Sequence, residues 1–118
     1  MKGLRKDMRI EYLEAAVSDL DNIMDYYFDQ FGIESAMKVY GQIKGSISHL
    51  AEHTNLGVPS KDQLLRRLGY RELYSGRFVA VYRREDEIIY IYHIADTQRD
   101  YPNLFKEGKK SKTNMSDM

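Results

Sequence analysis

The sequence predicts an α+β fold, in which two helices pack on a mainly antiparallel four-stranded sheet in the order β-α-α-β-β-β. Apolar residues recur at three- and four-residue steps over about residues 14–50, which is the period of amphipathic helices. They alternate at two-residue steps near the N-terminus and again over residues 68–94, which is typical of strands. The length of 118 residues fits one domain, predicted over residues 1–105, and the polar tail over 106–118 is expected to be mobile.

The first strand is predicted over Arg9–Leu13, where Ile10 and Tyr12 alternate with charged residues. A helix follows, and Gly32 is placed to end it in a left-handed cap. The second helix begins almost at once, so the two should form an antiparallel hairpin. The stripes expected to face the core are Ala16, Leu20, Ile23, Met24, Tyr27, Phe28 and Phe31 in the first helix, and Ala36, Val39, Tyr40, Ile43, Ile47 and Leu50 in the second.

A loop is predicted over residues 53–62, which are rich in glycine, proline, asparagine and serine. Three strands are then predicted over Leu68–Tyr74, Arg77–Arg83 and Glu87–Ile94, and the short turns between them permit only antiparallel neighbours. The last two strands are apolar on both faces, so we expect the helices over one face and a different cover, such as a partner, over the other. A short helical turn is predicted over Arg99–Phe105.

The composition excludes several classes of chemistry. The chain has no cysteine, so it has no disulfide, no thiolate metal site and no cysteine nucleophile. His49 and His53 are four residues apart, but no third ligand is obviously placed to complete a metal site, so neither a metal nor a cofactor is expected. No apolar run is long enough to span a membrane, and residues 1–8 lack the apolar centre of a signal peptide. A cytoplasmic protein is therefore expected.

The formal net charge is zero, but the charges are unevenly distributed. Residues 14–53 hold seven acidic residues against two lysines, and Asp21, Asp25 and Asp29 recur along the solvent side of the first predicted helix. These aspartates form either a solvated face or a surface for a basic partner segment. Residues 63–105 hold seven arginines and six acidic residues, which is a weaker basic excess than nucleic-acid binders usually show.

Two stretches carry a resemblance to a known family. The first is AVSDLDNIMDYYFDQFG at residues 16–32, and the second is GYRELYSGRFVAVYRREDEIIYIYHI at residues 69–94, followed by QRDYPNLF at 98–105. In order and spacing they resemble the RelE/ParE superfamily over about residues 8–105. The resemblance implies a small toxin of a type II toxin–antitoxin pair, neutralised by a cognate antitoxin that wraps it. It also implies one of two activities, ribosome-dependent cleavage of messenger RNA or inhibition of DNA gyrase by binding.

The residues favour the second activity. Metal-free RNA cleavage needs a base, an acid and cations that stabilise the phosphorane. Where the resemblance implies two of these cations, this chain has Val79 and Gln98. Losing one such donor costs about 3–4 kcal/mol of transition-state stabilisation. Arg77 would share a sheet face with Val79 and could substitute for it. The alternatives are an mRNA endonuclease with Arg71, Arg77, His93, Arg99 and Tyr101 as its catalytic residues, and a degenerate member that binds a partner without toxicity.

Seven residues are predicted to bind the target or the partner: Arg71, Tyr74, Arg77, Tyr82, Arg99, Asp100 and Tyr101. The three arginines either form one cluster for phosphate or carboxylate groups, or pair with local acids such as Glu72 or Asp100. The tyrosines of the sheet either pack in the core or form an interface. His93 is expected on the same sheet face as Ile91. The expected partners are an antitoxin and either gyrase or the ribosome with its mRNA, with no membrane and no small-molecule substrate.

Overall fold

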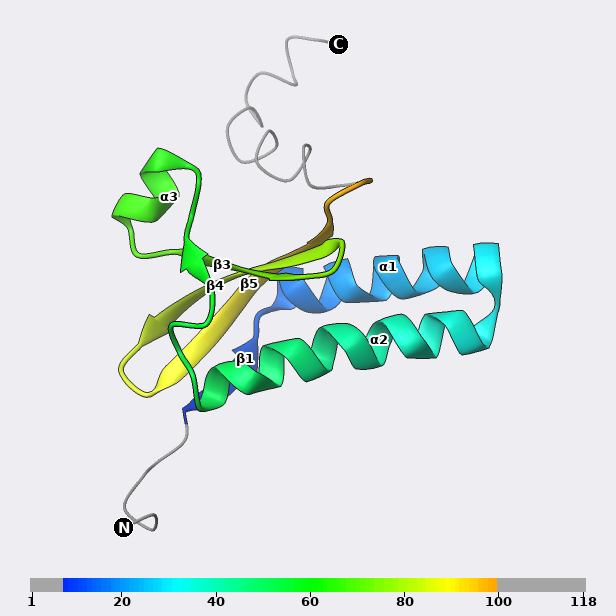
Figure 1. Cartoon of the computed structure of the whole chain (residues 1–118), viewed down its shortest axis with the longest axis horizontal. Helices are drawn as coiled ribbons and strands as arrows, with labels where there is room; N and C mark the ends of the chain where they lie inside the picture. Colours follow the sequence, from blue (N-terminus) through cyan, green and yellow to red (C-terminus); the bar gives the residue numbers. More distant parts are fainter. Residues whose placement is uncertain (1–7, 100–118) are drawn as a thin grey trace, which may run out of the picture.

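The computed structural model describes residues 8–99, so Asp100, Tyr101, the rest of the predicted turn to Phe105 and the tail over 106–118 lie outside the described residues. Figure 1 shows a helix hairpin against a twisted sheet. The elements are β1 (Arg9–Tyr12), α1 (Glu14–Phe31), α2 (Ile33–Ser48), the 3₁₀ turn η2 (His49–Ala51), β2 (Val58–Pro59), α3 (Gln63–Arg67), β3 (Arg71–Ser75), β4 (Phe78–Glu85) and β5 (Ile88–Asp96).

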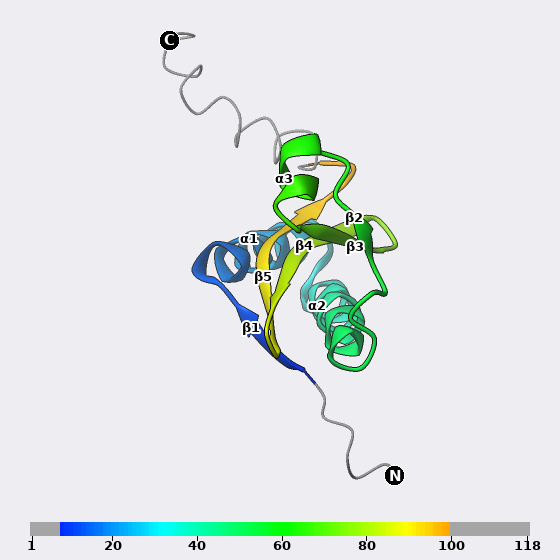
Figure 2. The same ribbon diagram turned by 90° about the vertical axis from the view of Figure 1, so that its left-hand side faces the viewer.

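The strands form one sheet in the order β1-β5-β4-β3-β2. β1 runs parallel to β5, with Arg9 beside Ile88 and Tyr12 beside Ile91, and all other neighbouring strands are antiparallel. The parallel pair arises because the chain passes from β1 into the helix hairpin and later forms three antiparallel strands joined by short turns. The last of these strands, β5, lies beside β1. Figure 2 shows β1 and β2 at opposite edges of the sheet. The predicted α+β class and the mainly antiparallel sheet are confirmed.

The loop predicted over residues 53–62 contains a fifth, two-residue strand, β2, which pairs with β3. The segment after it forms the short helix α3, where no element was predicted. β3 begins at Arg71, whereas this strand was predicted from Leu68. The carboxylate of Asp62 caps α3 by accepting a hydrogen bond from the Leu65 amide at 3.0 Å, and Gly69 follows the helix with φ +92°. A helix of five residues is too short for its apolar period to be visible in the sequence.

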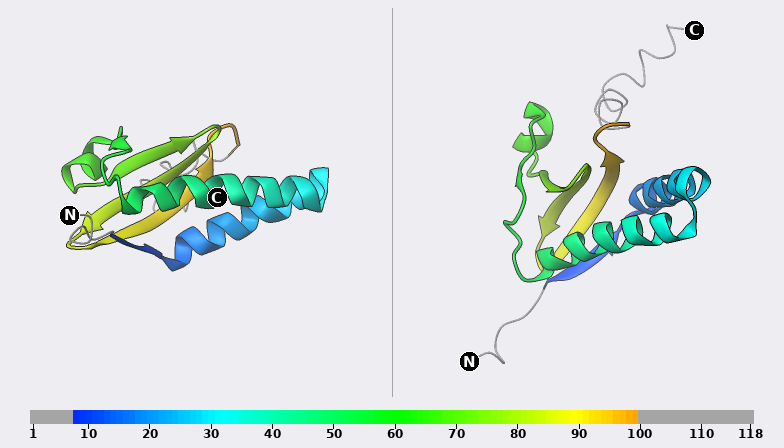
Figure 3. Two further views of the ribbon diagram at one scale, coloured as in Figure 1. Left: turned by 60° about the horizontal axis from the view of Figure 1, so that its bottom comes forward. Right: turned by 45° about the vertical axis from the view of Figure 1, so that its right-hand side comes forward.

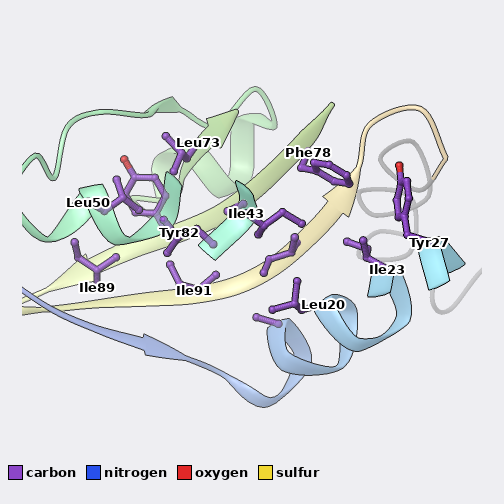
Figure 4. Close-up of a cluster of buried hydrophobic side chains, with 14 of the residues drawn as sticks. Leu20, Ile23, Tyr27, Ile43, Leu50, Leu73, Phe78, Tyr82, Ile89 and Ile91 are labelled. Carbon is purple, nitrogen blue, oxygen red and sulfur yellow. The ribbon is translucent and has the colours of Figure 1, made fainter. Parts of the chain in front are cut away.

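The core lies between the hairpin and one face of the sheet (Figure 4). α1 and α2 contribute most of their predicted stripes, and β4 and β5 meet them with Phe78, Ile89 and Ile91. Burying each such large apolar side chain stabilises the fold by roughly 1.5–3 kcal/mol. The predicted antiparallel hairpin is confirmed, and Gly32 joins its helices with φ +96°, a conformation that favours glycine.

Phe28 and Phe31 were expected to face the core, but 52% and 60% of their surfaces are exposed. The linked ends of the two helices reach past the ends of the strands, as Figures 1 and 3 show. At this end of the hairpin no sheet lies beneath the helices. The apolar stripe of α1 is therefore longer than the surface that it covers.

An irregularity in β5 changes which residues face the core. Tyr82 pairs with Ile91, whereas the preceding Val81 pairs with His93, so Tyr92 is an extra residue in the ladder. Ile91 and Ile94 both join the core although they are three residues apart. The expectation that His93 shares a face with Ile91 is therefore wrong, because the bulge reverses the alternation between them.

The sheet face opposite the helices is here called the outer face. By strand alternation and register, it carries Tyr70, Glu72, Tyr74, Val79, Val81, Arg83, Tyr90, Tyr92, His93 and Ala95. Val79, Val81 and Ala95 are buried but do not belong to the core between the sheet and the hairpin. The prediction that both faces of β4 and β5 are apolar is thus confirmed at these positions.

Candidate functional site

A buried carboxylate organises one end of the sheet. Asp96, the last residue of β5, has no exposed surface. It accepts hydrogen bonds from the Arg77 Nε at 2.9 Å, the Gln98 amide at 2.9 Å and the Tyr27 hydroxyl at 3.1 Å. Burial alone would raise the pKa of this carboxyl, but the hydrogen bonds from Arg77, Gln98 and Tyr27 outweigh it and hold the pKa below its usual value. Asp96 therefore stays charged.

Two arginines flank a pair of tyrosines beside this carboxylate. Tyr26 and Tyr27 pack edge to face with ring centroids 5.2 Å apart. The guanidinium of Arg99 lies 3.7 Å from the centre of the Tyr26 ring, and that of Arg77 lies 5.9 Å from the Tyr27 ring. Such cation–π contacts hold a guanidinium in a fixed plane. The five residues Tyr26, Tyr27, Arg77, Asp96 and Arg99 are here called the arginine cluster.

Arg77 is oriented in a way that suits recognition of an anion. Its Nε is held by Asp96, and this contact raises the pKa of the guanidinium. Its two Nη groups carry four of the five N–H donors of a guanidinium. Among residues 8–99 they make no hydrogen bond and no ion pair, and 35% of the side chain is exposed. The remaining donors are therefore free to bind a carboxylate or phosphate in a bidentate manner.

Arg71 and Tyr82 belong to a separate, structural network. Tyr82 is fully buried, and its hydroxyl donates to the Thr54 carbonyl at 3.0 Å while accepting from the Gly57 amide at 3.1 Å and the Arg71 Nε at 3.2 Å. Arg71 also donates to the Gly57 carbonyl at 2.7 Å. These contacts hold the loop before β2 against the sheet. Tyr82 offers no surface, and Arg71 pairs with neither Glu72 nor the arginine cluster.

Tyr74 lies on the outer face, where its hydroxyl donates to Glu72 at 2.8 Å and Lys61 lies 5.1 Å from its ring centre. Glu72 is fully buried and also accepts from the Ser60 hydroxyl at 2.9 Å and the Lys61 amide at 3.2 Å. This carboxylate fixes the turn between β2 and α3. Tyr74 as a whole is 38% exposed.

A second aromatic group lies further along the outer face. The rings of Tyr70 and Tyr92 meet edge to face at 4.8 Å, and the Arg83 guanidinium lies 5.5 Å from the Tyr70 ring centre. Burial, followed by the hydrogen bond with Tyr70, raises the pKa of Tyr92. Tyrosine and arginine are the side chains enriched at protein interfaces. The predicted binding residues did not include these three.

His93 is held at the uncovered edge of β5. Its Nδ1 lies 2.9 Å from the Asp19 carboxylate, whose same oxygen accepts the Ile94 amide at 2.9 Å. β1 pairs with β5 only as far as Ile91. Beyond that point, the Asp19 side chain of α1 accepts the Ile94 amide of β5 in place of a strand partner. The geometry gives His93 a role in closing the sheet edge.

The structure thus divides the predicted site residues among different places. Arg77 and Arg99 come together at the arginine cluster, Arg71 and Tyr82 share the structural network, and Tyr74 lies on the outer face. Asp100 and Tyr101 lie outside the described residues. The sequence interpretation missed Asp96 and Tyr26. In the sequence, the one indication that Asp96 is important was its place as a charged residue at the end of a long apolar run. Within residues 8–99, no group of three metal-binding side chains is present, and no helix is long and apolar enough to cross a membrane.

Comparisons with known proteins agree with this architecture. The family model described as ParE toxin of type II toxin–antitoxin system, parDE, matches residues 10–101. Toxin ParE1 of Caulobacter vibrioides is 35% identical over 68 residues, which is 58% of this chain and 68% of that protein. A structure of the chromosomal ParDE toxin–antitoxin system from P. aeruginosa superposes with a TM-score of 0.65 at 28% identity, covering 75% of this chain and 95% of the other.

A toxin–antitoxin complex, RelBE2 of Mycobacterium tuberculosis, shares the fold alone, with a TM-score of 0.54 at 15% identity over 76% of this chain and 98% of the other. Together with the match to the ParE toxin family model, the hairpin on a mainly antiparallel sheet identifies a RelE/ParE superfamily toxin, as the sequence resemblance implied. Within that superfamily, the chain belongs to the ParE toxin family of type II toxin–antitoxin systems.

Proposed function

We propose that this toxin arrests growth in the cytoplasm by binding a macromolecular target stoichiometrically, with DNA gyrase as the target that the family suggests. A cognate antitoxin would neutralise it by covering the outer face and the arginine cluster. The observation that carries the proposal is the placement of Arg77, which a buried carboxylate holds while its Nη donors remain open. Pre-oriented arginines beside tyrosines are typical anchors of protein interfaces.

Several contacts weigh against the nuclease alternative. Val79, which stands where the resemblance implies a catalytic arginine, is 1% exposed. Arg71 is engaged by Tyr82 and the Gly57 carbonyl, and His93 contacts Asp19. General acid–base catalysis needs a group within hydrogen-bond reach of the substrate. Of the four described residues in the alternative nuclease site, Arg71 and His93 therefore have structural contacts and lie apart from the arginine cluster.

The first experiment is induction of the chain in a bacterium that lacks its antitoxin. Growth arrest is expected, and normal growth would leave only the degenerate, non-toxic interpretation. Purified protein is then added to a gyrase supercoiling assay and, separately, to a translation extract whose mRNA is mapped. We expect inhibition of supercoiling and intact mRNA. Codon-positioned cuts would overturn the proposal in favour of the nuclease.

A variant tests the arginine cluster directly. R77Q/R99Q should raise the protein concentration needed for half-inhibition by at least about tenfold, because both guanidiniums are removed and binding energy is concentrated in few residues. The matched control is Arg67→Gln, which removes an exposed arginine of α3 and should leave inhibition unchanged. Melting temperatures of all proteins verify that they fold. Equal inhibition by R77Q/R99Q and the control would show that the cluster does not contact the target.

A further inference from the structure

The connected ends of α1 and α2 carry an apolar surface that the fold does not use. Four large side chains there are more than half exposed: Phe28 at 52%, Phe31 at 60%, Ile33 at 58% and Met37 at 55%. They are here called the hairpin patch. Isolated apolar residues are common on protein surfaces, but several that lie together usually mark an interaction site.

The spacing of these residues groups them in two pairs that meet at the connection between the helices. Phe28 and Phe31 are three residues apart on α1, and Ile33 and Met37 are four apart on α2, so each pair lies on one side of its helix. Gly32 joins the pairs directly. The ring of Phe31 leans on Tyr27, with centroids 5.8 Å apart, which ties the patch to the core. The patch lies beyond the ends of the strands, at the opposite end of the molecule from α3 (Figures 1 and 3).

The charges around the hairpin patch are acidic. Asp25 precedes it on α1, Asp29 lies between Phe28 and Phe31, and Glu34 lies in the first turn of α2; all three are exposed. Among residues 8–99 none of the three forms an ion pair or a side-chain hydrogen bond. Lys38 is the one basic residue from Glu14 to Gly41, and Arg99 lies over Tyr26, next to Asp25. The three acids therefore exceed these two cations by one, which leaves the surroundings of the patch acidic.

Resting on the proposed function, we propose that the hairpin patch docks a basic amphipathic helix of the target protein. The apolar side of that helix would cover Phe28, Phe31, Ile33 and Met37, and its lysines or arginines would meet the acidic rim. Antiparallel helices that expose apolar side chains at their connected ends can accept a third helix, in the way that helical bundles pack. The acidic rim selects a basic helix over an acidic one. The patch adjoins the arginine cluster, because Phe31 packs on Tyr27 of that cluster, so the docked helix would extend the contact made there.

The opposite end of the molecule provides the control. Leu64 and Leu68 beside α3 are 62% and 52% exposed, so they resemble the hairpin patch in apolar exposure. Their neighbours Arg66 and Arg67 are basic, however. A basic helix should therefore discriminate between the two ends through charge, although both are apolar.

The binding test uses two labelled 18-residue amphipathic peptides of equal helical spacing, one of leucine and lysine and one of leucine and glutamate, followed by fluorescence anisotropy. The wild-type chain should bind the leucine–lysine peptide. F28Q/M37Q, which spares the Phe31–Tyr27 contact, and D25K/D29K should each weaken that binding by about tenfold or more, whereas L64Q/L68Q should change it by less than about twofold. Unchanged binding in either hairpin variant would overturn the proposal, as would equal weakening by L64Q/L68Q.

Two further measurements connect the patch to toxicity. If the wild-type chain arrests growth, F28Q/M37Q should lose arrest while keeping the wild-type melting temperature, and L64Q/L68Q should still arrest; arrest by F28Q/M37Q would overturn target docking at the patch. A wild-type chain that does not arrest growth would instead refute the proposed function, and the peptide assay would still decide whether the patch binds a basic helix. In sedimentation, self-association that F28Q/M37Q abolishes would assign the patch to a second copy and overturn the proposal.

Discussion

Replacing Asp96 by asparagine should destabilise the fold substantially at neutral pH. The aspartate accepts bonds from Arg77 and Gln98 through one oxygen and from Tyr27 through the other. In the variant, the remaining carbonyl oxygen can keep the first two bonds, but as an uncharged acceptor, so each is weaker by about 1 kcal/mol than its counterpart to the carboxylate. The new amide group replaces the acceptor of the Tyr27 hydroxyl, which costs about 1 kcal/mol more. Arg77 can be hydrated at the surface, so weakening its bond adds no cost of leaving a charge buried. The total loss of folding stability is therefore about 2–3 kcal/mol.

Urea unfolding followed by circular dichroism measures this loss, with Asp25→Asn as the control because that acid is exposed and unpaired within the described residues. The control should lie within about 0.5 kcal/mol of wild type. The lowered pKa of Asp96 means that its charge stabilises the folded state above the unfolded pKa of about 3.9 and that this stability is lost as the pH falls through the folded pKa. The difference between wild type and variant should therefore be full at pH 7 and shrink below about pH 4. A loss under about 1 kcal/mol, or an equal gap at pH 7 and pH 3, would refute the reasoning.

Other substitutions test the remaining buried contacts. Tyr82→Phe should cost about 2–4 kcal/mol, because it leaves the Gly57 amide and a loop carbonyl without their partner, and thermal unfolding would detect the loss. Gly57→Ala should cost about 2 kcal/mol or more, since an added Cβ would lie 2.5 Å from the Glu72 carbonyl oxygen; wild-type stability in a urea titration would contradict that clash. Asp19→Ala should cost about 1–2 kcal/mol of folding stability and speed hydrogen exchange of the Ile94 amide. Exchange of that amide at the wild-type rate would contradict this role of Asp19.

The sequence by itself determined the elements that depend on neighbours along the chain. The helical stripe that includes Ala16, Leu20 and Ile23 predicted α1, and Gly32 predicted where it ends. The alternation of β4 and β5 predicted two strands that are apolar on both faces. These features follow from periodicity and local turn chemistry, which any short window of the sequence contains.

Only the tertiary structure decided which distant residues meet. Arg77 pairs with Asp96, nineteen positions away, and Arg71 with Tyr82, because strand register places those residues side by side. One extra residue in β5 moved His93 off the face of Ile91. Phe31 remained exposed because the hairpin is longer than the sheet beneath it. Register, bulges and the relative lengths of packed elements arise from contacts between segments far apart in the chain, and the pattern within one segment does not encode them.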